Sequence, residues 1–426
     1  MTQSSPQSAP PAQGVGRHDW ERETTSRTGA GVIDDPYPLL AELRPLNGGV
    51  HNASFFQMFG MRDPTSEQWK DSPRFATLSY AATEHVLREN RIFTNAGIRR
   101  MTEHAFGPVS LMGSDDPEHR QFRLLVQPAF GKRAMGLWQS WVKPRLTELI
   151  DSFEAKGATD LYFEYCSKFP VFVIAMTLGV ARADLDQFQE WAGLMQIGAA
   201  PADRARGARL EVEDYMRAVI EDRRARPRDD LISLLVESEI TEEGERRKIT
   251  EQQILGLVCN LLPAGVGTTF RSLGILLVTL LQRPRLLARL YADRSLIPAV
   301  VEEVLRWNGP VLTAPFRLTE EDTEVAGVKI PKGALVEPGI AAANRDPAQF
   351  DDPETFDPFR PAKPMLAFSY GAHFCVGGQV ARMELREALG ALLDRLPNLR
   401  FDPDQPEPRL TGLLYRMPTG VPAAWG

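Results

Sequence analysis

The sequence predicts a mainly α-helical protein with minor, segregated β-sheets. Helical spacing of apolar residues dominates residues 35–310. One apolar segment inside this region, residues 250–283, is long enough to cross a whole domain. Alternation of apolar and polar residues takes over beyond residue 310. A period of 3.6 residues indicates helices and a period of two indicates strands, so the three observations together favour a helical body with a small sheet component.

Composition and charge restrict the class of protein. The chain has 426 residues, of which 43% are hydrophobic and 25% charged, as in an ordinary soluble globular protein. Its net charge of -7 argues against a nucleic-acid partner. Three widely spaced cysteines, Cys166, Cys259 and Cys375, suit a reducing compartment.

Neither end of the helical region carries a targeting signal that we recognise. The N-terminal stretch lacks the basic and apolar regions of a signal peptide, and the apolar run "LGILLVTLL" is too short to span a bilayer. Residues 1–30 are rich in Ser, Pro, Gln, Gly and Thr, so we expect a flexible tail. We expect residues 31–426 to form a single catalytic domain of a cytoplasmic protein that has no membrane partner.

Four segments carry the clearest helix signals. "HRQFRLLVQPAF" is amphipathic, and "RLTELIDSFEAKG" is predicted to stop at Gly157. "DDLISLLVES" is predicted to start at Asp229 or Asp230. The central helix is predicted to start at Thr250, where "TEQQ" forms a capping box, and to end before Pro284. At about 32 residues this helix would be roughly 48 Å long.

The C-terminal part alternates between strands, a loop and one helix. Residues 316–339 carry alternating apolar residues and Gly at turn positions, which predicts short strands. Residues 343–361 are rich in Pro and Asp and are predicted to form an ordered loop. A last amphipathic helix follows Cys375, and the final segment is strand-like again.

The central helix contains an unfavourable stretch, "LLPAGVGTTF". By intrinsic propensity, Pro263 costs roughly 3 kcal/mol and each glycine about 1 kcal/mol. Proline also leaves the carbonyl of Cys259 without its usual partner. Positions 256, 260, 264, 268 and 272 form one stripe of small or polar residues, which is a reasonable lining for a cavity. We expect the helix to open locally at this stretch and to admit a small molecule between its turns.

The stretch "FSYGAHFCVGG" places Cys375 between glycines, directly before a helix. A helix N-terminus lowers the pKa of a nearby thiol, and glycines let the backbone approach a flat or bulky group. Two other interpretations stay open on this evidence. Cys375 could be a small buried hydrophobe, or a catalytic nucleophile, although the sequence places no obvious base and His373 is only two residues away.

Phe368, Gly371, Cys375 and Gly377 match the signature Phe-x-x-Gly-x-x-x-Cys-x-Gly. By these residues the chain resembles the cytochrome P450 family of the soluble bacterial type. The resemblance implies that family's fold, with haem b held between the long central helix and the cysteine-bearing loop and helix. It implies that Cys375 is the axial thiolate ligand, whose electron donation favours O–O cleavage. It also implies that N–H groups after Cys375 bond to the sulfur and that Phe368 packs on the thiolate side of the haem.

Further motifs follow in the order of the family. Glu303 and Arg306 resemble its Glu-x-x-Arg pair, and Arg360 resembles the arginine of the loop that joins the pair. Such an (i, i+3) pair taken alone would be an ordinary surface pair. The resemblance implies that the three residues support the core beside the haem.

Four residues resemble the family's contacts to the haem propionates: His119, Arg123, Arg317 and His373. Each taken alone would be an ordinary surface charge. Two propionates carry about two negative charges, which would be costly to bury without cations.

The resemblance places the central helix on the oxygen-binding face, with Ala264, Gly265, Gly267 and Thr268 in the family's Ala/Gly-Gly-x-Asp/Glu-Thr pattern. Thr268 is implied to assist proton delivery to oxygen, and Ala264 to limit the approach of substrate. Thr268 could instead bond back to the carbonyl of Ala264.

The family's acid is missing here, because Gly267 stands in its place. Three replacements are open: a water chain, which we favour, a carboxylate from another segment, or the use of hydrogen peroxide.

The implied substrate is a largely hydrophobic small molecule. The residues implied to contact it are Phe106, Leu111, Met112, Leu194, Met195, Asn260, Leu312, Thr313, Leu413 and Leu414, with Asn260 as a hydrogen-bonding group. Plain core packing is the alternative for each of them. The chain shows no flavin or iron–sulfur motif, so the implied electron donors are a separate ferredoxin and ferredoxin reductase. Basic residues near the cysteine face could bind an acidic partner: Arg120, Lys132, Arg133 and Arg382.

Three functional hypotheses follow. The leading one is a haem-thiolate monooxygenase that inserts one atom of dioxygen into the substrate and reduces the other to water. The second is a peroxide-driven haem-thiolate peroxygenase. The third, from a different class, is a non-catalytic haem sensor or carrier, which would not need Thr268.

Overall fold

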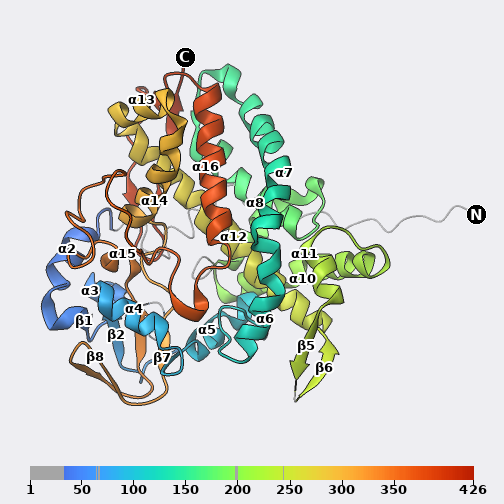
Figure 1. Cartoon of the computed structure of the whole chain (residues 1–426), viewed down its shortest axis with the longest axis vertical. Helices are drawn as coiled ribbons and strands as arrows, with labels where there is room; N and C mark the ends of the chain where they lie inside the picture. Colours follow the sequence, from blue (N-terminus) through green and yellow to red (C-terminus); the bar gives the residue numbers. More distant parts are fainter. Residues whose placement is uncertain (1–32, 64, 66–67, 197–199, 243) are drawn as a thin grey trace, which may run out of the picture.

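The structure is a computed structural model that describes residues 33–426 except 64, 66–67, 197–199 and 243. The predicted tail, residues 1–30, lies outside the described residues. A long central helix, α12, passes through the body of the molecule and packs against α8, α9, α10, α14 and α16 (Figure 1). The predicted class, mainly helical with small separate sheets, is therefore confirmed.

The helices and strands have the following bounds. The helices are α2 (Tyr37–Leu43), α3 (Phe55–Met58), α4 (Tyr80–Arg88), α5 (Ala96–Phe106), α6 (Glu118–Val126), α7 (Lys132–Asp151), α8 (Lys168–Thr177), α9 (Leu185–Met195), α10 (Ala202–Ala225), α11 (Leu231–Glu237), α12 (Glu251–Leu281), α13 (Pro284–Ala292), α14 (Ile297–Asn308), α15 (Ile340–Ala343) and α16 (Gly378–Arg395). The strands are β1 (Val50–His51), β2 (Arg74–Thr77), β3 (Phe93–Thr94), β4 (Ala158–Asp160), β5 (Glu239–Glu242), β6 (Glu245–Lys248), β7 (Arg317–Thr319), β8 (Thr323–Val325), β9 (Val328–Ile330), β10 (Leu335–Pro338), β11 (Arg400–Phe401), β12 (Leu410–Thr411), β13 (Met417–Pro418) and β14 (Pro422–Ala424).

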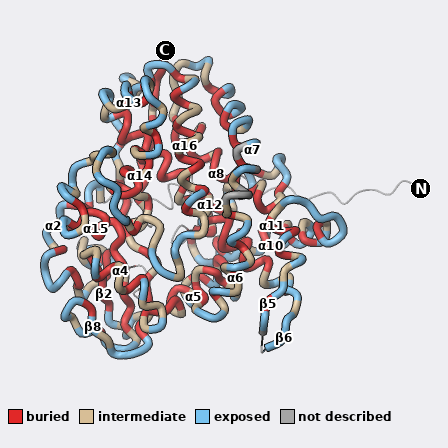
Figure 2. The backbone as a smooth tube through the Cα atoms, viewed as in Figure 1, coloured by how far each residue is buried: buried red, intermediate tan, exposed pale blue. Residues whose placement is uncertain are grey.

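The predicted start of α12 is confirmed by its cap. Thr250 accepts a hydrogen bond from the backbone N–H of Gln253, and the Gln253 side chain accepts one from the backbone N–H of Thr250. The helix ends at Leu281, three residues before Pro284. By length and composition α12 could cross a membrane, but 83% of its apolar window is buried inside the protein. It is the core helix against which the largest apolar cluster packs (Figure 2).

The largest sheet combines distant parts of the chain. Its strand order is β1-β2-β10-β7-β3, so three strands from residues 50–94 pair with two strands from residues 317–338. Strand β10 runs parallel to β2, with Leu335 opposite Arg74, and antiparallel to β7. The strands predicted within residues 316–339 are confirmed. Those of the N-terminal part were missed because each is only two to four residues long.

One local prediction differs from the structure, and one element was not predicted. Helix α7 ends at Asp151 rather than at Gly157, because the Ser152 hydroxyl bonds back to the Leu149 carbonyl (2.6 Å) and Phe153 turns into the core. Gly157 closes a following 3-10 turn instead. Between α11 and α12 the chain forms the hairpin β5–β6, which projects from the body (Figure 1). By contrast, Asp230 caps α11 as predicted, since it accepts from the N–H of Ser233.

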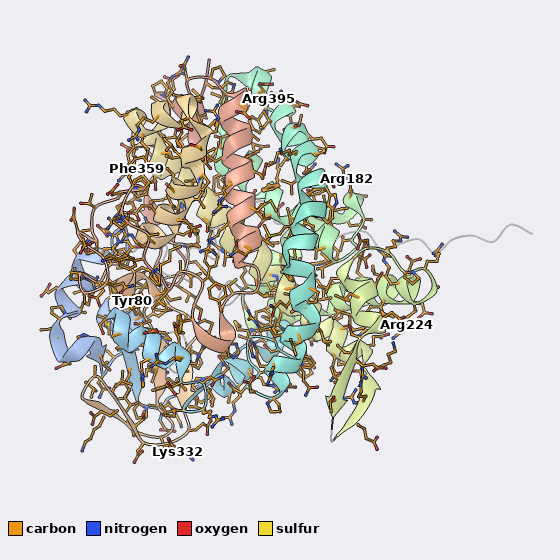
Figure 3. All side chains as sticks on the ribbon, viewed as in Figure 1. Tyr80, Arg182, Arg224, Lys332, Phe359 and Arg395 are labelled. Carbon is orange, nitrogen blue, oxygen red and sulfur yellow. The ribbon has the colours of Figure 1, made fainter. Side chains whose placement is uncertain are left out.

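Surface charges form short-range pairs on the outside of the helices. Figure 3 labels Arg182, Arg224 and Arg395, which pair with carboxylates of neighbouring segments at the periphery of the molecule. Solvent-exposed pairs of this kind contribute about 0–1 kcal/mol each. They differ from a small set of buried arginines, described below, that surround the functional residues.

Candidate active site

A tight turn carries Cys375 to the start of α16. The N–H of Cys375 donates to the carbonyl of Phe368 (2.9 Å), which closes the loop. Gly371 has φ 71°, and a Cβ there would lie 2.8 Å from the Leu87 carbonyl, so a side chain is excluded at this position. The turn therefore presents the sulfur by backbone geometry.

Cys375 differs from the other two cysteines because its side chain is accessible while theirs are buried. Burial nevertheless raises the pKa of the Cys375 thiol, opposed by hydrogen bonds from the N–H groups of Gly377 and Gly378 and by nearby arginines. Accessibility combined with desolvation describes a group that faces an internal space rather than the outer surface. The two N–H groups aimed at the sulfur favour a thiolate.

Four basic side chains gather beside this turn. The rings of His119 and His373 stack with centroids 3.9 Å apart, and His373 Nε2 lies 2.8 Å from Asn95 Nδ2. Burial, followed by the charge of Arg317, lowers the pKa of His373 to about 2. Burial also lowers the pKa of Arg317 to about 10, which the Asp115 carboxylate partly opposes. Burial also lowers the pKa of His119, so both imidazoles are neutral near pH 7, and Arg123 and Arg317 carry the positive charge of the cluster.

A buried ionic network joins α14 to the loop of residues 344–361. Arg306 donates two hydrogen bonds to the Glu303 carboxylate, at 2.8 and 2.7 Å. Arg360 donates to the same carboxylate at 3.0 Å, and the N–H of Asp357 donates at 2.9 Å. The two arginines also bond to backbone carbonyls of the loop. The geometry predicted for this trio is therefore present.

Helix α12 passes the site with Thr268 and Ala264 on its accessible side. Thr268 Oγ1 donates to the Ala264 carbonyl at 2.8 Å, which is the back-bonded arrangement. The predicted local opening is absent, because α12 is continuous through residues 261–270. The glycines instead allow close packing: a Cβ at Gly265 would touch Ile174 of α8, and one at Gly267 would lie 2.1 Å from Gln196 Nε2. Tertiary contacts thus override the weak local propensity.

Comparison with known proteins decides the family. A model of the cytochrome P450 family matches residues 199–420. The mycinamicin IV hydroxylase/epoxidase of Micromonospora griseorubida is 36% identical over 388 residues, covering 88% of this chain and 97% of that protein. The chain belongs to the cytochrome P450 family. The P450 monooxygenase PikC of Streptomyces venezuelae is 33% identical over 395 residues, covering 89% of each chain. The solved structure of P450 CYP109Q5 from Chondromyces apiculatus has a TM-score of 0.80 and 32% identity, covering 93% of this chain and 97% of that one.

This P450 is accordingly an oxidoreductase of the monooxygenase class, and its family implies a haem-thiolate cofactor. The residues present fit that group. A Cβ at Gly377 would meet nothing within 4 Å, so protein packing leaves room for a group beside the sulfur. Arg123 and Arg317 carry positive charge of the kind that two propionates require, and the neutral rings of His119 and His373 lie beside them with N–H groups to donate.

Asn260 of this P450 has a structural role that differs from the predicted one. Its side-chain oxygen accepts from Ser110 Oγ (2.9 Å) and from the N–H of Met112 (3.4 Å). Its amide nitrogen donates to the carbonyls of Gly256 (2.8 Å) and Val109 (3.3 Å). The prediction of a substrate hydrogen bond is wrong, because the amide is already committed to the loop that precedes α6.

The residues predicted to contact substrate divide into two groups by burial. Met195, Leu312 and Leu413 are at most 1% exposed and belong to the apolar cores, so core packing explains them. Phe106 and Leu111 are also buried. The remaining apolar candidates and Thr313 are partly accessible, as residues that line a cavity would be: Met112, Leu194, Thr313 and Leu414.

Sequence reasoning missed three polar residues of α12 and its neighbours. Arg271 lies in the apolar half of α12 and is fully buried against Gln196. Glu384 of α16 is buried and accepts a hydrogen bond from Thr269, and burial raises its pKa well above the usual range. A lone charge within "TTFRSLGILLV" is the signal that could have identified Arg271.

Among the candidates for an acidic partner, Arg382 is not free. It donates to the Glu302 carboxylate at 2.7 and 3.0 Å and stacks on Phe368 with 4.3 Å to the ring centroid. Arg120 is exposed. The side chains of Lys132 and Arg133 lie outside the described part of the structure.

Proposed function

We propose that this protein is a haem b monooxygenase that inserts one atom of dioxygen into a largely hydrophobic small molecule and reduces the other atom to water. Electrons come from a separate ferredoxin and its reductase. The observation that carries the proposal is the Cys375 turn, in which two backbone N–H groups bond to an accessible sulfur at the start of α16.

The residues around Cys375 would hold three parts of the site: the iron, the propionates and the supporting loop. Cys375 ligates the iron, with Gly371 and Gly377 shaping its turn and Phe368 packing beside it. His119, Arg123, Arg317 and His373 hold the propionates, and the Glu303–Arg306–Arg360 network keeps the loop of residues 344–361 in place. When bound, the haem supplies the iron at which dioxygen is reduced.

Thr268 and Ala264 form the part of α12 that the reacting oxygen meets. While Thr268 donates its proton to the Ala264 carbonyl, its lone pairs remain free to accept a proton from water. Rotation of the hydroxyl then turns its proton away from the Ala264 carbonyl and toward the oxygen being reduced. Ala264 is small and accessible, so it sets how close substrate can approach, while Met112, Leu194, Thr313 and Leu414 line the surrounding pocket.

The proposed organisation is a single catalytic domain over residues 31–426 behind a flexible tail, in a cytoplasmic protein. Three free cysteines agree with a reducing compartment. Relatives named as hydroxylases and epoxidases of secondary metabolites support a substrate of that general kind.

Isotope labelling tests the proposal. A library of apolar compounds is first screened for a substrate-induced shift of the haem Soret band, and a hit is then turned over with a surrogate ferredoxin, its reductase and ¹⁸O₂. One labelled oxygen atom per product molecule is expected. Efficient turnover with hydrogen peroxide alone, and none with the redox partners, would favour the peroxygenase instead. Absence of any product with either oxidant would favour a haem sensor or carrier.

A further inference from the structure

Arg271 is an unusual residue for the middle of an apolar helix. Its side chain is 0% exposed and is flanked by the rings of Phe270 and Tyr415, whose centroids lie 4.8 and 4.7 Å from its Cζ. Its Nη1 donates to Gln196 Oε1 (2.6 Å) and to the Gly267 carbonyl (3.0 Å). No carboxylate pairs with it among the described residues. A buried guanidinium that is held only by neutral oxygens destabilises the folded state, so a functional role is expected for it.

Three hydrogen-bond donors converge at this place without an acceptor from the described part of the chain. They are Nε and Nη2 of Arg271 and Nε2 of Gln196. Buried donors left without an acceptor cost about 1–3 kcal/mol each. In folded proteins such groups are commonly satisfied by ordered water, which takes two to four polar partners. We call Arg271 and Gln196 together the Arg271–Gln196 node.

The node occupies the space of the missing acid. A Cβ on Gly267 would lie 2.1 Å from Gln196 Nε2 and 2.4 Å from Gln196 Cδ, so the amide stands where a side chain at 267 would stand. Arg271 fixes that amide from one turn further along α12. Gly267 is therefore not simply a deletion of the acid, because N–H donors have replaced a carboxylate at the same place.

The node also lies on the Thr268 side of α12. Residues three apart on a helix are neighbours on one face, so Arg271 flanks Thr268. Gln196 reaches the helix from the end of α9, beside Gly267. Glu384 accepts a hydrogen bond from Thr269, which follows Thr268 on the side of α12 away from Gly267. Glu384 is therefore a separate candidate for supplying protons.

We propose that Arg271 and Gln196 are positioning residues that hold the proton-donating water beside Thr268, in place of the acid that Gly267 lacks. A water that accepts from these donors has its own protons directed outward, and an adjacent cation favours loss of one of them. That proton passes to Thr268 Oγ1, whose own proton passes to the oxygen being reduced, and the water regains a proton from solvent. The inference rests on the proposed monooxygenase function, because the protons are those that dioxygen reduction consumes.

The test removes the node and compares it with a matched arginine. The variants are Arg271→Met and Gln196→Leu, and the control is Arg283→Met. Arg283 makes the same kind of contacts: its Nη1 donates to the Thr279 carbonyl (3.0 Å), and it stacks on Trp307 and Phe356. It lies beyond the end of α12, remote from Thr268.

Three readouts separate positioning from a structural role. These are the fraction of NAD(P)H electrons recovered in product, the solvent deuterium isotope effect on turnover, and the spectroscopic Kd for substrate. For both node variants we expect about a tenfold loss of coupling and a larger isotope effect, with Kd changed by less than about twofold. Arg283→Met should leave all three unchanged. If Arg271→Met does not fold, Gln196→Leu still carries the test.

Two results would overturn the proposal. One is unchanged coupling in the node variants together with a weakened Kd, which would make the node part of the substrate pocket. The other is loss of coupling in Glu384→Gln but not in the node variants. Normal thiolate spectra and ¹⁸O incorporation in these proteins would show that the monooxygenase assignment stands even if the node does not act as proposed.

A rescue experiment uses the same geometry. G267D alone should uncouple the enzyme, since its Cβ would displace the Gln196 amide from Arg271. G267D combined with Q196A has room for the carboxylate, four residues before Arg271 on the same face. The double variant should regain at least half of the wild-type coupling. A double variant that folds but stays uncoupled would contradict the idea that the node replaces an acid.

Discussion

Glu303→Gln tests the buried network that joins α14 to the loop of residues 344–361. The Glu303 carboxylate accepts four hydrogen bonds, two from Arg306 at 2.8 and 2.7 Å, one from Arg360 at 3.0 Å and one from the Asp357 N–H at 2.9 Å. Glutamine keeps the volume but removes the charge and turns one acceptor into a donor that faces guanidinium donors. Removing one partner of a buried ion pair costs about 3–5 kcal/mol, because the remaining charge is left uncompensated.

The neighbouring residue supplies the control for this variant. Glu302 also accepts two hydrogen bonds from an arginine, Arg382, but its carboxylate is 38% exposed. Glu302→Gln should therefore cost only about 0–1 kcal/mol. Equilibrium urea unfolding followed by tryptophan fluorescence measures both values. A loss in Glu303→Gln of less than about 1 kcal/mol, or no greater than in Glu302→Gln, would refute the reasoning.

Two further predictions concern the glycines of the turn and a buried acid. Gly371→Ala should destabilise the protein with or without haem, since φ is 71° and the new Cβ would overlap the Leu87 carbonyl. Gly377→Ala should leave the unfolding of the haem-free protein unchanged and weaken haem binding, because its Cβ would meet only the space beside the sulfur. Equal destabilisation of the haem-free protein by the two variants would contradict this. Burial raises the pKa of Glu337 to about 7, so its carboxyl stays protonated in the folded state and ionises in the unfolded state above its usual pKa of 4.5. The free energy of unfolding therefore holds the full contribution of this carboxyl below about pH 4.5. It falls by about 3 kcal/mol as the pH rises from about 4.5 to about 7. Glu337→Gln should remove that part of the pH dependence of the unfolding free energy, and an unchanged slope would count against it.

Features with a local cause were predictable from the sequence. The capping box at Thr250, the cap at Asp230 and the turn around Cys375 all depend on residues within a few positions of one another. The Glu303–Arg306 pair lies on one helix, and its third member was found through the family pattern.

The features that were missed depend on segments distant in the sequence. The opening expected in α12 does not occur because Ile174 and Gln196 pack against its glycines, and neither contact can be read from the helix itself. The polar character of Asn260 suggested a substrate contact. Its hydrogen bonds go instead to a loop about 150 residues earlier in the chain, which the helix sequence does not reveal. Strands of two residues, such as β1 and β3, carry no period and form only because β2 and β7 provide their partners.

The most direct measurement of the central claim is the absorption spectrum of the reduced protein with carbon monoxide. Haem bound through the Cys375 thiolate predicts the strongly red-shifted Soret band of a thiolate ligand in the wild type, and its loss in Cys375→Ser. A purified protein that binds no haem, or a Cys375→Ser variant that keeps the band, would contradict the account.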